Sequence, residues 1–387
     1  MKKLIYLSQM KLDEKLSRDW YLDNFYEKGY EVEFWDVSNI IQKNNQVNTT
    51  DKNIKIINIE TISSLVKNVL ELKINKVFII ITIPYVYQSL SIYRILSKYN
   101  LNTVFFSWGE MPNLVHQKNI LTKLLNLYKI NKNIYQFIKN MYQRQVVKLY
   151  RKLNLINKYS ICFAAGDLCN SLAYSDKLIP INLCDYDQNL KKSEQIVKGK
   201  YAVFLDINLP FNSDVELQGL VKIDPQEYYI TLNKFFDLFE KKYNLKIVIA
   251  AHPKSNYKED IFANREVYFL KTPQLIKFCE HVLLHYSTAL SYAILNYKPV
   301  TFFTTDQMKY TYEYHMGKLL SEHIKQPFVS LTDIKIDNFS FKEDIDHGVY
   351  DKYKYNYIVS KESEGKLSFP LIENAIATFT QQEQNIL

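Results

Sequence analysis

The chain has 387 residues and a mass of 45.9 kDa, which is enough for two globular domains of ordinary size. Its hydrophobic fraction of 47% and charged fraction of 23% are globular values, and they exclude a disordered or collagen-like chain. Only 8 glycines are present, and the nearest pair, Gly348 and Gly365, lies 17 residues apart. The GxGxxG and P-loop motifs are therefore absent, so a bound nucleotide must be held by side chains and helix N-termini.

The cysteine pattern and the hydropathy pattern predict a cytoplasmic protein. The 4 cysteines form no CxxC pair and have no His-rich cluster beside them, which argues against a metal or redox site. Residues 1–7 begin like a signal peptide, but charged residues follow before an adequate apolar stretch. The longest apolar run, residues 77–87, is far shorter than the ~18 residues of a membrane span.

In the first part of the chain, short β-type runs alternate with longer helical patterns. Apolar runs predict strands at residues 3–8, 31–37, 54–59, 76–83, 103–108 and 159–165. The 3.6-residue period predicts helices at residues 12–28, 61–72 and 88–99, and a long helical region from about 114 to 155. Strands that are apolar throughout are typical of parallel sheets covered on both faces. We therefore predict that residues 1–184 form a Rossmann-like domain.

A polar connector is expected at residues 185–200, after which the alternation starts again. Apolar runs predict strands at residues 201–205, 246–251, 267–270, 281–285 and 299–303. Helices are expected at residues 225–243, 273–279 behind an N-capping Thr272, 287–296 and 370–381. The second domain is predicted at residues 201–366, and residues 367–387 are predicted to be a terminal helix and tail. Two doubly wound α/β domains bind a ligand in the cleft between them, at the carboxyl ends of the strands.

The net charge of +8 is concentrated in the basic helical region, residues 111–158. No Asp or Glu occurs between Met111 and Gly166, whereas Lys and Arg recur throughout that stretch. Such a region attracts an anionic membrane, a nucleic acid or an acidic glycan. Nucleic acid is disfavoured because no recognised nucleic-acid-binding motif accompanies the charge. The alternative interpretation is a solvated helical face.

Two strand ends of the second domain carry polar side chains suited to phosphate. Residues 246–251 lead into His252, Pro253, Lys254 and Ser255, and the Lys and Ser add hydrogen-bond donors. A turn His bonded to backbone is the alternative for His252. The strand at residues 281–285 ends in a second group, His285, Ser287 and Thr288. At a helix start, the free N–H groups and the dipole favour an anion, although simple capping by Ser287 would also fit.

These residues, together with Lys298-Pro299-Val300 on the next strand, resemble bacterial glycosyltransferases of the GT-B fold, over roughly residues 201–303. The resemblance is to enzymes that use CMP-activated acidic sugars: sialyltransferases, polysialyltransferases and 3-deoxy-octulosonic acid (Kdo) transferases. It implies that His252, Ser287 and Thr288 contact the donor phosphate. Teichoic-acid CDP-glycerol transferases are similar at the same places, so the motif implies a cytidine donor more strongly than any one sugar.

Two carboxylates compete for the role of general base. Glu110 follows the strand at residues 103–108, and members of the family carry an acidic motif with the base there, although here Gly109 precedes a single Glu. Asp206, accompanied by Asn208, follows the strand at residues 201–205 and also points to the predicted cleft. A separate acidic pair, Asp185 and Asp187, is expected in a solvated part of the connector.

The sequence thus predicts an α/β protein with the GT-B fold, two facing Rossmann-like domains and a C-terminal helix. The predicted activity is inverting transfer of a nonulosonic acid or Kdo from CMP to a bacterial surface glycan, either lipooligosaccharide, capsule or O-antigen. No metal or cofactor is expected. The predicted partners are the donor, a glycan or glycolipid acceptor and the inner face of the cytoplasmic membrane, where the enzyme would be peripheral. The alternatives are a CDP-glycerol or UDP-sugar transferase, or a non-catalytic glycan- or nucleotide-binding protein.

Overall fold

The structure is a computed structural model. It describes residues 3–41, 48–49, 54–72, 77–112, 134–172, 174–211, 223–253, 255–257, 260–309, 311–332 and 344–384. The chain divides into two compact units. Unit 1 comprises Met1–Glu110, Asn133–Cys184 and Val359–Leu387, and unit 2 comprises Met111–Lys132 and Asp185–Ile358. Residues 359–366, which we expected in the second domain, therefore group with unit 1.

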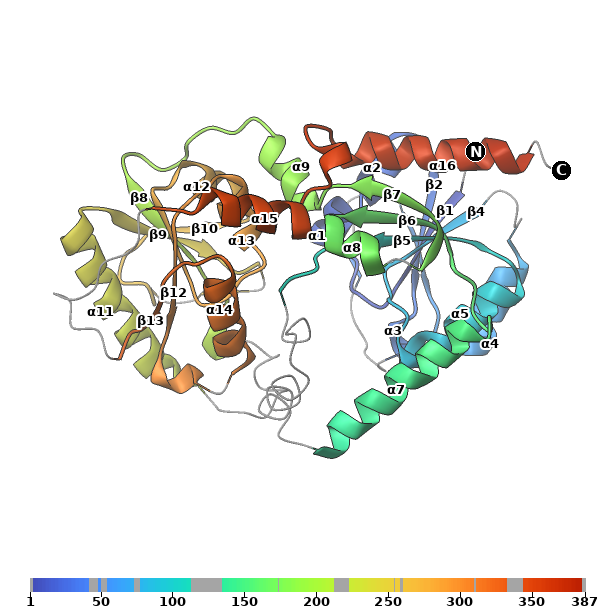
Figure 1. Cartoon of the computed structure of the whole chain (residues 1–387), viewed down its shortest axis with the longest axis horizontal. Helices are drawn as coiled ribbons and strands as arrows, with labels where there is room; N and C mark the ends of the chain where they lie inside the picture. Colours follow the sequence, from blue (N-terminus) through green and yellow to red (C-terminus); the bar gives the residue numbers. More distant parts are fainter. Residues whose placement is uncertain are drawn as a thin grey trace. The chain divides into compact units, whose positions relative to one another are not determined.

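Within the described residues, unit 1 is built on a seven-stranded sheet with the order β3-β2-β1-β4-β5-β6-β7 (Figure 1). The strands are β1 (Lys3–Ser8), β2 (Glu31–Asp36), β3 (Lys55–Asn58), β4 (Val77–Ile81), β5 (Asn102–Ser107), β6 (Tyr159–Ala165) and β7 (Ser175–Ile181). All neighbouring pairs are parallel, as the continuous apolar runs indicated.

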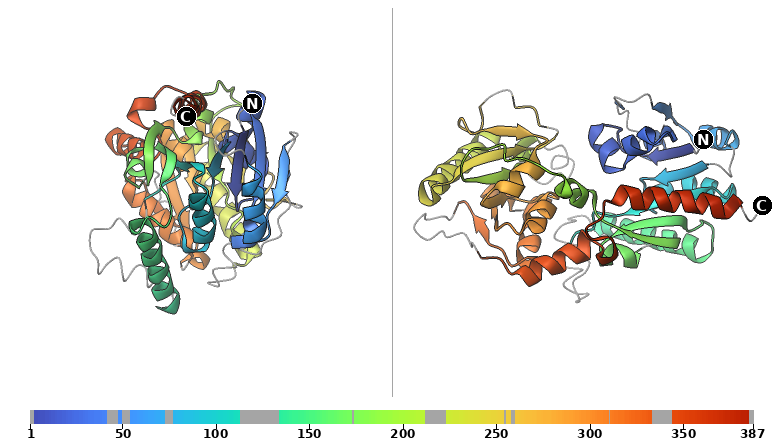
Figure 2. Two further views of the ribbon diagram at one scale, coloured as in Figure 1. Left: turned by 90° about the vertical axis from the view of Figure 1, so that its right-hand side faces the viewer. Right: turned by 90° about the horizontal axis from the view of Figure 1, so that it is seen from above.

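Helices cover both faces of this sheet. They are α1 (Glu14–Asp19), α2 (Leu22–Glu27), α3 (Ser38–Ile41), α4 (Ile62–Leu70), α5 (Leu90–Lys98), α7 (Ile134–Lys152), α8 (Asp167–Leu172) and α16 (Ser368–Gln384). Because side chains alternate along a strand, Ile5 and Leu7 pack on one face and Leu4 and Tyr6 on the other. The first core receives α4, α5 and α7, and the second receives α1, α2 and α16. Figures 1 and 2 show α7 and α16 on opposite sides of the sheet.

One helical prediction for unit 1 is wrong, and a second is tested only in part. The helix expected at residues 12–28 is divided into α1 and α2, because Tyr21 adopts a left-handed conformation (φ 58°) that ends one helix and starts the next. Of the long helical region predicted from 114 to 155, the structure describes α7, while residues 113–133 lie outside the described residues.

The sequence pattern missed β7, which forms an edge of the sheet. Exposed polar residues begin this strand, and Pro180 lies within it, opposite Ala164. Pro is tolerated in an edge strand, where its missing N–H removes no ladder bond on the open side. The strand therefore lacks the continuous apolar run on which the prediction relied.

Unit 2 contains a second parallel sheet, six-stranded over the described residues, with the order β10-β9-β8-β11-β12-β13. Its strands are β8 (Tyr201–Leu205), β9 (Lys246–Ala251), β10 (Val267–Phe269), β11 (His281–Leu284), β12 (Val300–Thr304) and β13 (Phe328–Ser330). Its helices are α9 (Cys184–Leu190, which starts at the end of unit 1), α11 (Pro225–Tyr243), α12 (Thr272–Phe278), α13 (Leu290–Leu295), α14 (Tyr312–His323) and α15 (His347–Tyr357). Helices α14 and α15 and strand β13 were not predicted.

Helix α11 begins where the sequence indicated, since Asp224 caps the Glu227 N–H at 2.9 Å and Pro225 occupies the first turn. Thr272, expected as an N-cap, is instead the first residue of α12, behind Lys271. The expected solvated connector also begins as a helix, α9, in which Asp187 is buried. Asp185 of that helix accepts hydrogen bonds from the hydroxyls of Ser291 and Tyr292, which also belong to unit 2. This segment is therefore held by residues that lie far away in the sequence.

The C-terminal segment is fixed to unit 1 through Asn182, which is completely buried. The Asn182 amide donates to the carbonyl oxygens of Ser363 (2.9 Å) and Lys366 (3.0 Å). Its amide oxygen accepts from the Ser363 hydroxyl at 2.9 Å, and its backbone N–H donates to the Ser368 hydroxyl at 3.1 Å. The amide group of Asn182 thus bonds to the segment just before α16, which explains why residues 359–366 belong with unit 1.

We expect Asn182→Ala to lower the free energy of unfolding of unit 1 by about 2–3 kcal/mol, because buried carbonyl and hydroxyl groups would lose their partners. Chemical denaturation of the full chain measures this. Asn374→Ala, at an exposed position of α16, is the matched control and should change stability by less than about 0.5 kcal/mol. Equal effects of the two substitutions would show that Asn182 does not fix the C-terminal segment.

Candidate functional site

Three of the predicted site residues follow neighbouring strands of the unit 2 sheet. His252 follows β9, Asp206 follows β8 and His285 follows β11, and these strands are adjacent in the order β9-β8-β11. Because all three strands are parallel, their carboxyl ends lie at one edge of the sheet. Ligands of doubly wound α/β folds bind at this edge. The sheet therefore brings together three of the polar groups that the sequence singled out.

Asp206 connects two segments of this edge through hydrogen bonds. Its side chain is 5% exposed, and its Oδ1 accepts the Asn208 N–H at 3.0 Å. The other oxygen, Oδ2, accepts the Tyr257 hydroxyl and, at 3.4 Å, the His252 N–H. Burial raises the pKa of Asp206 above its usual value, and the hydrogen bonds from Tyr257, Asn208 and His252 offset that rise in part. A carboxylate buried and bonded in this way joins the end of β8 to the loop after β9.

The loop after β9 begins with a compact turn around His252, whose side chain is partly exposed. The His252 carbonyl accepts the Ser255 N–H at 2.9 Å and the Ser255 hydroxyl at 2.6 Å. Pro253 is exposed, and Lys254 lies outside the described residues. The Ser255 hydroxyl, which we expected to bind a donor, thus bonds to the turn itself. His252 is itself partly exposed at this strand end.

Ser287 and Thr288 lie in a turn that precedes α13, whereas we expected them to open that helix. The helix begins at Leu290, and the Leu290 and Ser291 N–H groups bond to the carbonyls of Ser287 (3.2 Å) and Thr288 (3.3 Å). The Ser287 hydroxyl accepts the Ala289 N–H at 3.2 Å within this turn. The N-cap of α13 is Ala289, so Ser287 does not cap the helix as the alternative interpretation expected. The Thr288 side chain is exposed.

His285 is buried, although we expected it among the donor-binding residues. Its side chain is 1% exposed, and its Nδ1 lies 2.7 Å from the Phe303 carbonyl and its Nε2 2.7 Å from the Tyr228 hydroxyl. A carbonyl only accepts, so Nδ1–H donates to Phe303 and Nε2 accepts from Tyr228. A Cβ on Gly317 of α14 would lie 2.3 Å from the His285 carbonyl oxygen, so only glycine allows that helix to pack there. The imidazole therefore supports the strand end from inside the core.

Glu110 belongs to unit 1, at the carboxyl end of β5. It follows Gly109, whose φ of 74° favours glycine, and its side chain is partly exposed. The strand end is fixed to α8 by the Ser107 hydroxyl, which donates to the Cys169 carbonyl at 3.3 Å. Glu110 thus lies just beyond the carboxyl end of β5, as its place in the sequence predicted, and this is the edge at which doubly wound folds bind ligands.

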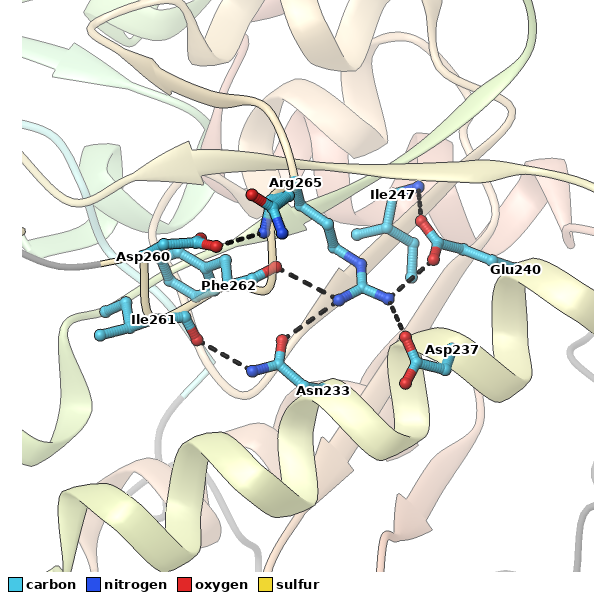
Figure 3. Close-up of polar contacts among 9 residues, drawn as sticks. Asn233, Asp237, Glu240, Ile247, Asp260, Ile261, Phe262 and Arg265 are labelled. Atoms are coloured by element: carbon cyan, nitrogen blue, oxygen red, sulfur yellow. Dashed lines mark hydrogen bonds and ion pairs between the residues drawn. The ribbon is translucent and has the colours of Figure 1, made fainter.

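An arginine that the sequence analysis missed fixes the far end of the loop after β9 (Figure 3). Arg265 is 7% exposed in its side chain, and its Nη2 lies 2.6 Å from Asp237 Oδ1 and 2.7 Å from Glu240 Oε2 on α11. Its Nη1 donates to the Phe262 carbonyl and to Asn233 Oδ1, both at 3.2 Å. Burial by itself lowers the pKa of Arg265, but the bonds to Glu240 and Asp237 outweigh it and raise the pKa. The sequence around Arg265 gives no sign that this residue pairs with α11, because its partners lie 25 and 28 residues earlier in the chain.

No group of three or more His, Cys, Asp or Glu side chains in the described part of the chain is placed to hold a metal ion. Among the helices that the structure describes, none is long and apolar enough to cross a membrane.

No protein family profile matches this chain, and no curated protein matches its sequence. Several solved structures do match its fold. A variant of the wall teichoic acid polymerase TagF is 10% identical over 99% of this chain and 90% of that chain, with a TM-score of 0.54. Arabidopsis thaliana UGT89C1 is 7% identical over 98% and 99%, with a TM-score of 0.51. The calicheamicin glycosyltransferase CalG4 is 8% identical over 92% of each chain, with a TM-score of 0.50.

These similarities and the two parallel sheets define the class: the chain has the GT-B fold, as predicted. At such low identity they concern the fold alone. The CMP-sugar specificity that the sequence motifs implied remains a prediction.

We expect Arg265→Gln to lower the free energy of unfolding by roughly 2–3 kcal/mol, because the part-buried Glu240 carboxylate loses its cation while Asp237 remains solvated. Urea denaturation measures this. The control is Lys246→Gln, which breaks an exposed pair with Glu266 and should cost less than about 1 kcal/mol. A loss for Arg265→Gln no larger than the control would contradict the role assigned to the arginine.

Acid should destabilise unit 2 through its buried histidines. Burial lowers the pKa of His285 to about 4 and that of His281 to about 3, so the unfolded state, with a pKa near 6.5, binds protons first as the pH falls. The contribution of these histidines to the free energy of unfolding is therefore greatest above about pH 6.5 and is lost progressively as the pH falls towards 4. His285 accounts for up to about 3 kcal/mol of this loss. The raised pKa of Asp206 acts in the opposite sense at the acidic end of this window.

The measurement is urea denaturation of the wild type and of His285→Asn between pH 4 and pH 8. Asn keeps a donor for the Phe303 carbonyl but has no imidazole to protonate, so its stability should fall less steeply with acid. Parallel pH curves for the two proteins would contradict the assignment of His285 as a neutral, buried group.

Proposed function

We propose that this protein is an inverting glycosyltransferase that uses a cytidine-activated acidic sugar, a nonulosonic acid or Kdo, and transfers it to a bacterial surface glycan. Its donor binds at the carboxyl edge of the unit 2 sheet, and its acceptor binds to unit 1. The observation that carries the proposal is the buried Asp206 carboxylate, which holds the His252 turn at the ligand-binding edge of a GT-B fold.

The donor phosphate is assigned to His252 and to the turn that contains Ser287 and Thr288. These two segments follow β9 and β11, which flank β8 in the sheet. Among the predicted phosphate ligands, His252 and Thr288 have accessible side chains, whereas His285 is buried. Lys254, two residues after His252, adds a cation for the same phosphate.

In the proposed reaction the acceptor hydroxyl attacks the anomeric carbon, and the bond from that carbon to the phosphate oxygen breaks. Glu110 takes the hydroxyl proton as general base. His252 stabilises the negative charge that develops on the departing CMP phosphate, which is the role of a fixed donor in an electrostatic site. Asp206 is buried and already bonded to three groups, so we assign it to positioning the His252 turn and not to the base.

The cytidine preference rests on the His-Pro dipeptide and the Ser-Thr pair. A specific observation supports a second candidate, because the wall teichoic acid polymerase TagF matches this fold with a TM-score of 0.54. Transfer of a polyol phosphate from CDP-glycerol would use the same phosphate-binding turn. A UDP-sugar transferase is a further alternative on this fold, and a protein that binds nucleotide without turnover is the non-catalytic one.

A thermal-shift series with CMP, CDP, UMP, UDP and GDP decides among these donors, since a ligand that binds only the folded state raises the melting temperature. Stabilisation by CMP and release of CMP from CMP-sialic acid or CMP-Kdo in the presence of acceptor would support the proposal. Stabilisation by CDP with turnover of CDP-glycerol would favour the second candidate. Stabilisation by UDP alone would overturn the cytidine assignment.

His252→Ala is expected to lower kcat by on the order of 10²-fold with little change in melting temperature, because a stabiliser of developing charge is lost. Asp206→Asn should instead raise KM for the donor together with a smaller fall in kcat, because the turn loses its anchor while the imidazole remains. His347→Ala, at an exposed histidine of α15, is the control and should leave the rate unchanged. A large drop in melting temperature for His252→Ala would make this residue structural and would contradict the assignment.

A further inference from the structure

Helix α7 (Ile134–Lys152) exposes an apolar stripe on the side that faces away from its own unit. Ile138, Met141, Tyr142 and Leu149 are 59%, 46%, 63% and 50% exposed. Their spacings of three, four and eleven residues place them along one side of an α-helix. Large apolar side chains that are exposed singly are ordinary, but a row of four on one helix face marks an interaction surface.

The opposite side of α7 fixes the helix in this orientation. Val147 is buried in the unit 1 core, and Val146 and Tyr150 pack against the same core. The Arg151 guanidinium lies 4.0 Å from the centroid of the Tyr174 ring. The stripe therefore cannot turn inward unless these contacts break. Figure 2 shows α7 extending past the sheet of unit 1.

The charge of α7 has one sign only. The helix carries Lys139, Arg144, Lys148, Arg151 and Lys152, and it has no Asp or Glu. Helix α11 has the same length, but its three Lys residues are balanced by Glu227, Asp237 and Glu240. Arg144, Lys148 and Lys152 lie along the border of the apolar stripe and are exposed. We call the stripe and these three residues together the α7 face.

We infer that the α7 face binds the surface of an anionic lipid bilayer, with the helix lying in the plane of the interface. The four apolar side chains would enter the boundary between headgroups and acyl chains, while the basic side chains neutralise lipid phosphates. A polyanion in solution would use the charges but leave the apolar stripe in water. A neutral apolar partner would leave the charges unpaired. The anionic bilayer is the partner that satisfies both.

This inference does not depend on the identity of the donor or on turnover. Vesicle binding is measured without any substrate, so its failure would leave the proposed glycosyl transfer untouched. If both hold, the α7 face would bring unit 1, to which we assign the acceptor, to a lipid-anchored acceptor.

The experiment is co-sedimentation of the full chain with vesicles of phosphatidylcholine alone and of phosphatidylcholine with 30% phosphatidylglycerol, over a series of salt concentrations. We expect binding to the anionic vesicles, at least tenfold weaker binding to the neutral ones, and a steep loss of binding as salt rises. Equal binding to both vesicles would overturn the electrostatic part of the inference. Binding to neither would overturn it entirely, and binding to heparin instead would assign the α7 face to a soluble polyanion.

Two pairs of substitutions test the two components of the α7 face. Arg144→Gln with Lys148→Gln should weaken binding to anionic vesicles by roughly 25-fold, about fivefold for each charge removed. Ile138→Gln with Leu149→Gln should weaken it at least tenfold. The control pair is Lys67→Gln with Leu70→Gln on α4, which removes one exposed charge and one apolar side chain that is 64% exposed. A control pair as damaging as the α7 pairs would show that binding is not located on α7.

Discussion

The bond between the Asp206 carboxylate and the His252 turn is the interaction on which the candidate site depends. It joins the ends of two neighbouring strands, and it places a buried negative charge beside the loop that carries the histidine. Burial by itself makes such a charge unfavourable, and the donors from Asn208, Tyr257 and His252 offset that cost. Losing the bond from Tyr257 or from His252 would therefore loosen the loop and leave the buried carboxylate with fewer donors.

The same loop is held near its start by hydrogen bonds to a carboxylate and near its end by an ion pair. Asp206 fixes its start through hydrogen bonds from backbone and tyrosine, and Arg265 fixes its end by an ion pair with Glu240. Between them, the loop carries Pro253 at the surface. Buried His285 supports the neighbouring strand end without contacting solvent.

The exposed surfaces of the two units differ in character. In unit 2, the features of interest are single side chains at strand ends, as a bound nucleotide would require. In unit 1, the exposed α7 face is extended, apolar along its middle and basic along its border. A small ligand has no use for such a surface, whereas a large planar partner does. The distribution of charge along the chain, with no acid between Met111 and Gly166, is consistent with that division of roles.

The sequence by itself determined the parallel α/β class and the ends of many strands, because continuous apolar runs and clear caps are local signals. It placed β1, β6, β8 and β9 at their observed bounds and put His252 and Asp206 at strand ends. It could not find edge strand β7, the fold-back of Arg265 or the burial of His285, because these depend on partners far away in sequence. Only the tertiary structure decided whether a polar side chain is accessible to a ligand or is buried and bonded within the protein. Burial and hydrogen-bond partners depend on the packed sheet and not on the local segment.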